Sequence, residues 1–298
     1  MKSKLLAILA CVLWGTAFAG AKYGFEFMEP IRLSGFRFTL AGMLLWPLMY
    51  YKSIGIKSLI PHSRFICFFA FIQTFLQYGL FFMGLNRVPG ATSAVVVGAG
   101  PLFVAILAHF TMGNDRLGWR KIMAITLGLS GVVFISFSKG ELAGSGWQYY
   151  IGLALLISSN LIGATTNILV AKYKANLSPI ALTSIANFLG GLLLIITSYF
   201  VETDKAIHLP LSFWGVLLWL AFIPAAGFSI WYSLLQKPGT KVSDLNMWKF
   251  IIPVTGCIVS WLFLPNEYPT TSSVMGIVAI SCAILLLQMP TPKFLKRF

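Results

Sequence analysis

The chain has 298 residues, of which 58% are hydrophobic and 10% are charged, and its mean hydropathy is +0.84. Soluble domains are about 45–50% apolar and about 25% charged, so this composition excludes an ordinary soluble enzyme, a disordered chain and a coiled coil. In a soluble protein the net charge of +14 would suggest a nucleic-acid partner. In a membrane protein it indicates Lys and Arg held in cytoplasmic loops. We therefore expect a polytopic helical membrane protein that has no nucleic-acid partner.

Ten apolar runs are long enough for membrane-spanning helices, which need about 20 apolar residues to cross the bilayer core. They are residues 4–23, 31–51, 64–85, 91–112, 118–137, 147–171, 178–200, 212–235, 241–264 and 272–289. The connections between them are short, and turn residues such as Pro and Gly mark them. Because the runs are too long and too continuous for β-barrel strands, the expected fold class is an all-α polytopic membrane protein with ten transmembrane helices.

The distribution of Lys and Arg predicts the orientation of these helices, because basic residues favour cytoplasmic loops. With the N-terminus in the cytoplasm, fifteen basic residues fall inside: Lys2, Lys4, Lys52, Lys57, Arg64, Arg116, Arg120, Lys121, Lys172, Lys174, Lys237, Lys241, Lys293, Lys296 and Arg297. Five fall outside: Lys22, Arg32, Arg87, Lys139 and Lys205. This bias predicts an even number of helices with both termini in the cytoplasm.

The chain carries landmarks that repeat at a nearly constant spacing. These are Pro30 with Pro179, Pro89-Gly90 with Pro238-Gly239, Pro101 with Pro253, and Asp115 with Glu267. They predict two five-helix repeats, residues 1–140 and 141–298. Because five is odd, the second repeat enters the membrane from the opposite face, which is the inverted-repeat plan of many secondary transporters. The alternative is a coincidence of prolines in a helical bundle.

Short motifs in the chain resemble those of EamA-type transporters of the drug/metabolite transporter superfamily. Residues 13–18 (LWGTAF) with Lys22 are similar to the first-helix pattern, and residues 36–42 (FRFTLAG) to the second-helix pattern. Residues 89–94 (PGATSA), 101–102 (PL) and 113–116 (GNDR) resemble the fourth helix and the loop after it. The resemblance covers essentially the whole chain. It implies a ten-helix transporter of small organic metabolites or drugs.

Lys249 is the strongest candidate for a substrate-binding residue. It lies about eight residues into the ninth run, roughly 12 Å deep at 1.5 Å per residue, and an ionisable group at that depth is a functional hypothesis by default. Asn246 lies on the same helix face, and Pro253 should loosen the helix. Lys249 could hold the carboxylate or phosphate of a substrate. Alternatively, it extends to the cytoplasmic interface or pairs with Asp244.

Arg37 is the other basic residue within a span, about six residues into the second run. The resemblance to EamA-type transporters includes an arginine at this place in many members. The interpretation favoured by the sequence is a structural tie between Arg37 and a carboxylate of the outer loops, such as Glu26, Glu29 or Glu267.

Further polar candidates lie in the third and sixth runs. Gln73 and Gln77 share one helix face near the middle of the membrane, with Tyr78 beside them, and Asn160 and Asn167 align at helical spacing. Polar side chains at that depth face protein or water, not lipid. They could bind polar atoms of a substrate, or they could form hydrogen bonds between helices.

Aromatic and proline residues complete the candidate site. Trp14 lies in the middle of its span, away from the interfacial belt where tryptophan gathers, and could form an aromatic wall. Tyr232 is a further candidate, although anchoring or core packing also explains it. Pro101, Pro224 and Pro253 are candidate hinges, because broken helices can line a cavity and move during transport. A tightly packed, kinked helix is the alternative.

The predicted function is secondary transport by alternating access, of an amino acid, a nucleobase or nucleoside, an anionic metabolite or a drug. His62, His109 and His208 are scattered, and no metalloprotease, P-loop or esterase motif occurs, so neither an enzyme nor a metal or cofactor is expected. The alternative function is a lipid or polyprenyl-phosphate flippase. The expected location is the inner membrane. The expected partners are a small-molecule substrate and lipid, with a homodimer as an option.

Overall fold

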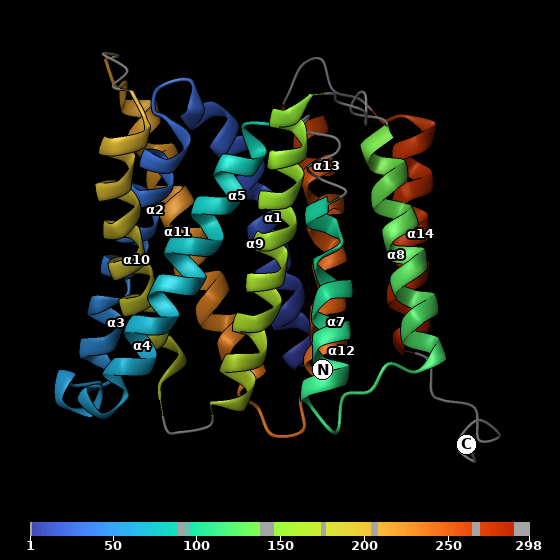
Figure 1. The fold of residues 1–298 in the computed structure, drawn as a ribbon, viewed down its shortest axis with the longest axis horizontal. Coiled ribbons are helices and arrows are strands. Elements are labelled where there is room, and N and C mark those ends of the chain that lie inside the picture. The colour runs from blue at the N-terminus through green and yellow to red at the C-terminus, as the bar shows by residue number, and fades with distance from the viewer. Residues whose placement is uncertain are drawn as a thin grey trace.

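The computed structural model describes residues 2–88, 93, 96–137, 146–173, 177–203, 208–263 and 269–288. Within these ranges the ordered elements are all helices, and they stand side by side in one bundle (Figure 1). This confirms the all-α fold class.

The first half of the chain forms these elements: α1 (Lys2–Phe25), α2 (Pro30–Leu44), α3 (Trp46–Tyr51), the short 3-10 turns η1 (Ile56–Ser58) and η2 (Ile60–His62), α4 (Ser63–Phe69), the π-helix η3 (Ala70–Leu76), α5 (Gln77–Leu85), α7 (Gly100–Thr111) and α8 (Trp119–Phe137). The second half forms α9 (Trp147–Lys172), α10 (Pro179–Val201), α11 (Leu211–Leu235), α12 (Val242–Asn246), the 3-10 segment η4 (Met247–Phe250), α13 (Ile251–Phe263) and α14 (Thr271–Gln288).

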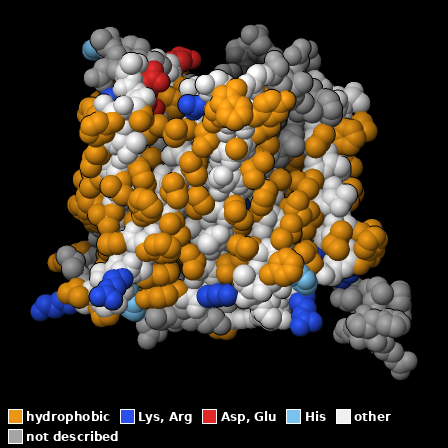
Figure 2. All heavy atoms as spheres, viewed as in Figure 1, with side chains coloured by type: hydrophobic (Ala, Val, Ile, Leu, Met, Phe, Trp, Pro, Cys, Tyr) orange, Lys and Arg blue, Asp and Glu red, His pale blue; other side chains and the backbone are white. Residues whose placement is uncertain are grey.

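Six helical stretches in the described chain are long and apolar enough to cross a membrane. They are Ile60–Leu85, Trp119–Ser136, Trp147–Lys172, Pro179–Val201, Leu211–Leu235 and Val242–Val259. Val96–Thr111 and Thr271–Leu286 are shorter apolar helices. Figure 2 shows hydrophobic side chains over the flank of the bundle, as lipid contact requires. The protein is therefore a multi-pass membrane protein, whereas the count of ten spans and the inverted repeat stay predictions.

Four of the runs expected to be continuous helices are interrupted. The second run breaks at Leu45, and Pro47 then lies in the first turn of α3, where its missing N–H is tolerated. In the third run a π-helix, η3, separates α4 from α5. In the fourth run residues 96–98 are helical, and the helix is interrupted at Ala99 before α7 begins at Gly100 with Pro101 in its first turn. In the ninth run η4 separates α12 from α13.

Hydrogen bonds show which helix ends lie together. Lys237, just after α11, donates to Ser3 at the start of α1, and Arg120 at the start of α8 donates to the Leu286 carbonyl near the end of α14. Figure 2 shows Lys and Arg side chains along this end of the bundle. At the opposite end the Glu202 carboxylate, just after α10, accepts the backbone N–H groups of Ile31 and Arg32 at the start of α2.

The helices pack in a definite set of pairs. The main pairs are α8 with α14, α2 with α10, α1 with α11, α1 with α13, α5 with α9, α7 with α9, α2 with α11 and α10 with η3. Glycines allow the closest of these contacts. A Cβ on Gly131 of α8 would lie 2.6 Å from the Gly276 carbonyl oxygen of α14, so a side chain there would push the two helices apart.

Candidate functional site

Lys249 lies in η4, and its ammonium group faces two indole rings. Its Nζ is 5.0 Å from the ring centre of Trp231 and 5.8 Å from that of Trp14. Within the described chain, no carboxylate forms an ion pair with it. Asp244, the alternative partner weighed from the sequence, instead lies 3.0 Å from Lys121. Because a ring quadrupole attracts a cation without neutralising it, the Lys249 charge remains uncompensated.

Two asparagines connect this lysine environment across three helices. The Asn167 Oδ1 atom accepts a hydrogen bond from Trp231 Nε1 at 2.8 Å and a longer one from Asn246 Nδ2 at 3.4 Å. The Asn246 Oδ1 atom and the Trp14 Nε1 atom are buried without a hydrogen-bond partner in the described chain. A buried acceptor and a buried donor without partners therefore belong to residues beside Lys249, one on the preceding turn of the chain and one on the Trp14 ring that faces it.

An aromatic cluster extends the site away from Lys249. The Phe228 ring centre lies 5.4 Å from that of Trp14, and the Phe228 ring stacks on Tyr232 at 5.4 Å with an interplanar angle of 17°. Tyr78 lies 6.4 Å from Phe228 and 4.5 Å from Phe38. Trp14 thus lies against Lys249, and Tyr78 and Tyr232 join this cluster through Phe228. Phe228 is an addition that the sequence analysis missed.

The remaining predicted amides make contacts between or along helices. Asn160 Nδ2 donates to the Val96 carbonyl at 2.5 Å. Gln77 packs its amide on Gly163, where a Cβ would lie 2.9 Å from Gln77 Nε2. Gln73 accepts a hydrogen bond from Thr74. The Asn160 bond is of the interhelical kind weighed as the alternative, whereas the Gln73 bond lies within η3; none of these contacts involves Lys249.

The three predicted hinge prolines lie in different settings. Pro101 occupies the first turn of α7, Pro253 is the third residue of α13, and Pro224 lies inside α11, which continues through it. The interruption nearest to Lys249 is η4 itself, because Lys249 is part of this 3-10 segment. Movement at any of these points stays a prediction.

A second charged cluster joins the loop after α7 to α8 and α12. The buried Asp115 carboxylate accepts hydrogen bonds from Lys121 Nζ at 2.5 Å and from the backbone N–H of Ser243 at 2.8 Å. Burial alone would raise the pKa of Asp115, but hydrogen bonds from Lys121 and Ser243 outweigh burial and lower this pKa below its usual value. In the sequence analysis Asp115 served only as a landmark of the repeat, and its contacts with Lys121 and Ser243 were not predicted.

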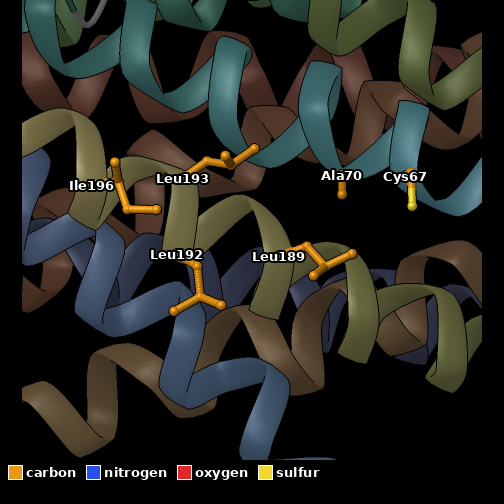
Figure 3. Close-up of a pocket in the computed structure, with 6 residues that line it drawn as sticks. All are labelled: Cys67, Ala70, Leu189, Leu192, Leu193 and Ile196. Atoms are coloured by element: carbon orange, nitrogen blue, oxygen red, sulfur yellow. The ribbon is translucent and has the colours of Figure 1, made fainter.

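Two surface pockets have linings that do not include Lys249. One, of about 350 Å³, is lined by six apolar side chains of α4, η3 and α10 (Figure 3). Another, of about 510 Å³, is lined chiefly by α11, with single residues of α1, α2, α3 and α10 and with Lys237. The first offers no polar group to a solute. In the part of the chain that the structure describes, no group of three His, Cys, Asp or Glu side chains could hold a metal ion.

The helical bundle and comparisons with known proteins define the class of this protein as a membrane transporter. The chain belongs to the EamA-like transporter family, whose sequence model matches residues 1–137 and again residues 150–289. As a member of a transporter family it is not an enzyme. These matches confirm the resemblance seen in the sequence motifs.

Individual relatives agree with this assignment. The chain is 26% identical over 291 residues to a protein of Chlamydia trachomatis serovar L2 named S-adenosylmethionine/S-adenosylhomocysteine transporter, covering 94% of this chain and 88% of that one. It is 25% identical over 289 residues to the uncharacterized transporter YvbV of Bacillus subtilis, covering 96% and 92%. A solved crystal structure matches 96% of each chain with a TM-score of 0.80 at 17% identity, which supports the fold alone.

Proposed function

We propose that this protein is a secondary transporter that carries a small organic metabolite with an anionic group, held at Lys249, across the cytoplasmic membrane. The observation that carries the proposal is the Lys249 ammonium group, which faces Trp14 and Trp231 without an anionic partner in the described chain. A cation within a membrane is costly unless a counter-charge compensates it. Asp244 is the one acidic residue in the expected spans, and it is paired with Lys121. The counter-charge is therefore assigned to the substrate.

The rings and amides around Lys249 favour an organic substrate over an inorganic anion. Trp14, Phe228 and Tyr232 offer apolar faces for a flat or apolar group, while Asn246 Oδ1 offers a free acceptor. Amino acids and anionic metabolites combine such features with an anionic group, whereas nucleosides offer the flat ring alone. The name of the Chlamydia relative adds S-adenosylmethionine and S-adenosylhomocysteine to the compounds worth testing.

An inverted repeat with cytoplasmic termini and alternating access is part of the proposal, and the helix pairs support it. In an inverted repeat each span of the first half corresponds to the span five places later in the second half. Under this correspondence α1 matches α9, and α11 matches the third span with η3 and α5, so the pair α1 with α11 corresponds to the pair of α9 with α5 and η3. The same correspondence converts α1 with α13 into α9 with α7, and α2 with α11 into α10 with η3. The pairs α2 with α10 and α8 with α14 map onto themselves. A pseudo-twofold relation of residues 1–140 to 141–298 produces this pattern.

A lipid flippase is less well supported than a solute carrier. A flippase would require the binding charge to be reachable from the lipid, through an opening between helices. The two surface pockets described above do not include Lys249. Because no deeply placed carboxylate is available for proton coupling, exchange or facilitated diffusion is the proposed mode of transport.

Uptake by proteoliposomes tests the proposal. The panel contains amino acids, nucleobases and nucleosides, sugar phosphates, S-adenosylmethionine and S-adenosylhomocysteine. For the transported compound, Lys249→Gln should lower uptake at least about tenfold, because a charge-assisted hydrogen bond contributes about 1.5–3 kcal/mol. Lys241→Gln, which removes an exposed lysine just before α12, is the matched control and should transport normally. Normal uptake by Lys249→Gln with unchanged half-saturation would contradict the proposal.

A further inference from the structure

One face of α2 carries buried polar groups that the Lys249 site does not use. Gly35 and Gly42 face α10, where a Cβ on either would collide with the α10 backbone. Arg37 lies about 200° around the helix from Gly35 at 100° per residue. Its side chain therefore lies on the side of α2 away from α10. Because Arg37 is only 7% exposed, this side of α2 is covered by protein.

Arg37 and Ser34 are both buried without hydrogen-bond partners. The Arg37 Nε atom and the Ser34 Oγ atom have none in the described chain, and Ser34 is fully buried. The two residues are one helical turn apart, a spacing that places their Cβ atoms about 5–6 Å from each other. A guanidinium and a hydroxyl group at this spacing form a pair of donors suited to a carboxylate or a phosphate.

These unpaired groups favour a role for Arg37 beyond a structural one. The tie to Glu26 or Glu29 expected from the sequence is absent, since no ion pair of Arg37 occurs in the described chain, and Glu267 lies outside it. The Arg37 guanidinium lies 5.0 Å from the centre of the Phe38 ring and interacts electrostatically with Tyr78, and neither residue supplies an anionic partner. Ser34 also lacks the bond to its own helix that Ser198 and Ser229 make with backbone carbonyls. Unpaired buried polar groups are costly in the folded protein, so their retention needs a reason.

Aromatic contacts connect these groups to the Lys249 site. Arg37 lies against Phe38, Phe38 against Tyr78, and Tyr78 and Trp14 both flank Phe228. The starts of α2 and α12 lie at opposite ends of the bundle (Figure 1). Arg37 is about 10 Å from the start of α2 and Lys249 about 12 Å from the start of α12. Because the bilayer core is about 30 Å thick, the two cations lie at different depths in it. The series of aromatic contacts described above connects them.

We propose that Ser34 and Arg37 form a second anion-binding site, in the half of the transport path opposite to Lys249. It takes the carboxylate or phosphate group of the substrate as this group passes between the two faces of the membrane. The inference rests on the proposed transport of an organic anion and deepens it, because it assigns two successive cationic positions to one substrate group.

Thermal unfolding of the purified full-length protein tests whether Arg37 is a structural residue. Replacement of an unpaired buried charge by an apolar residue of similar length is neutral or stabilising. Arg37→Met should therefore unfold at the same temperature as the wild type or at a higher one. A fall of more than about 4 °C, the scale of a lost structural interaction in a chain of this size, would overturn the proposal.

Thiol labelling tests the site without knowledge of the substrate. Ser34→Cys is introduced into a full-length protein whose four native cysteines are replaced, and its reaction with a sulfonate-bearing methanethiosulfonate is compared with a trimethylammonium-bearing one. After correction for their rates with a free thiol, the anionic reagent should react about tenfold faster. This preference should vanish with Arg37→Gln and persist with Arg37→Lys. It should also persist with Arg32→Gln, the matched control on the same helix.

The outcomes separate this site from the Lys249 site. Equal rates for the two reagents, no reaction with either reagent, or a preference unchanged by Arg37→Gln would overturn the second site. Sodium glutamate should slow the anionic reagent more than sodium chloride does at equal ionic strength, and equal slowing would assign the site to inorganic anions instead. Because labelling does not depend on uptake, normal uptake by Lys249→Gln would contradict the proposed function and leave the labelling result intact.

Discussion

Lys121 of α8 contacts α12, and Lys249 lies in η4 directly after α12, yet the surroundings of the two lysines are opposite. Lys121 contacts Asp115, Asp244 and the Ser243 hydroxyl group, at 2.5, 3.0 and 2.7 Å. Lys249 faces two indole rings and has no anionic partner in the described residues. A cation whose partners are all supplied by the chain stabilises the fold. A cation left without them is available to a ligand, and this difference separates a structural lysine from a candidate binding lysine.

The largest expected effect is a loss of stability in Asp115→Ala. The substitution removes the anionic partner of Lys121 and leaves the Ser243 backbone N–H unpaired. Removal of one partner of a buried ion pair costs about 3–5 kcal/mol. The thermal unfolding midpoint in detergent should fall by several degrees, whereas Lys249→Met, the matched control, should not lower it. An unchanged midpoint in Asp115→Ala would remove the distinction between the two lysines.

A smaller change is expected for the transport activity of Lys249→Met. This variant should lose at least about tenfold in uptake while it unfolds at the wild-type temperature or above it, because an apolar side chain of similar length replaces an unpaired charge. Lys237→Met at the end of α11 should transport normally. Destabilisation of Lys249→Met to the extent of Asp115→Ala would show that Lys249 is a structural residue.

Trp231→Phe should have a milder effect, because it keeps a ring beside Lys249 and removes the Nε1 donor to Asn167. A neutral hydrogen bond contributes about 1 kcal/mol, so the half-saturation concentration for uptake should rise about fivefold. Trp214→Phe, at an exposed tryptophan on the same helix, serves as the control. A change in Trp231→Phe no larger than in Trp214→Phe would place Trp231 outside the site.

The smallest effect concerns pH and the two carboxylates that accept backbone N–H groups at helix starts. Burial raises the pKa of Glu202 above its usual value of 4.5, against the backbone N–H groups of Ile31 and Arg32. The folded protein therefore binds this proton more tightly than the unfolded chain, and the associated stability is lost as the pH rises above 4.5. The unfolding midpoint should fall slightly from pH 4.5 to 7, and Glu202→Gln should reduce this slope.

The pKa of Asp115 is shifted in the opposite direction to that of Glu202, so the same pH series of unfolding midpoints also tests Asp115. Because its pKa lies below the usual value of 3.8, its stabilising effect is present above that pH and is lost as the pH falls through the lowered pKa. Asp115→Asn should flatten the decline below pH 4 without changing the slope above pH 4.5. Identical pH profiles for wild type, Glu202→Gln and Asp115→Asn would contradict both assignments.

The sequence predicted the membrane class and the transporter family because both depend on local composition and motifs. Lys249 and Trp14 were identifiable because charge and tryptophan at mid-span depth are unusual for any helix. The aromatic residues that surround them were harder to predict from the sequence. Phe228, Trp231 and Tyr232 share a helix face through their spacing, but only the packing of α1 against α11 brings that face to Trp14.

The interruptions within helices were the least predictable features. The π-helix η3 contains no proline or glycine, so no local signal distinguishes it from ordinary helix. The contacts of Arg37 were likewise not predictable from the local sequence. Its expected tie to Glu26 or Glu29 required a loop carboxylate to reach into the bundle, and the Glu202 carboxylate at that end instead accepts backbone N–H groups of α2.

A change of η4 from 3-10 to α-helical geometry would be a screw motion. A 3-10 segment turns by about 120° and rises about 2.0 Å per residue, against about 100° and 1.5 Å in an α-helix. Conversion of Met247–Phe250 to α-helix would rotate α12 by about 80° relative to α13 and shorten the segment by about 2 Å. Since Ser243 of α12 is bonded to Asp115, this twist would turn Lys249 between its indole rings and strain the carboxylate cluster in the same movement.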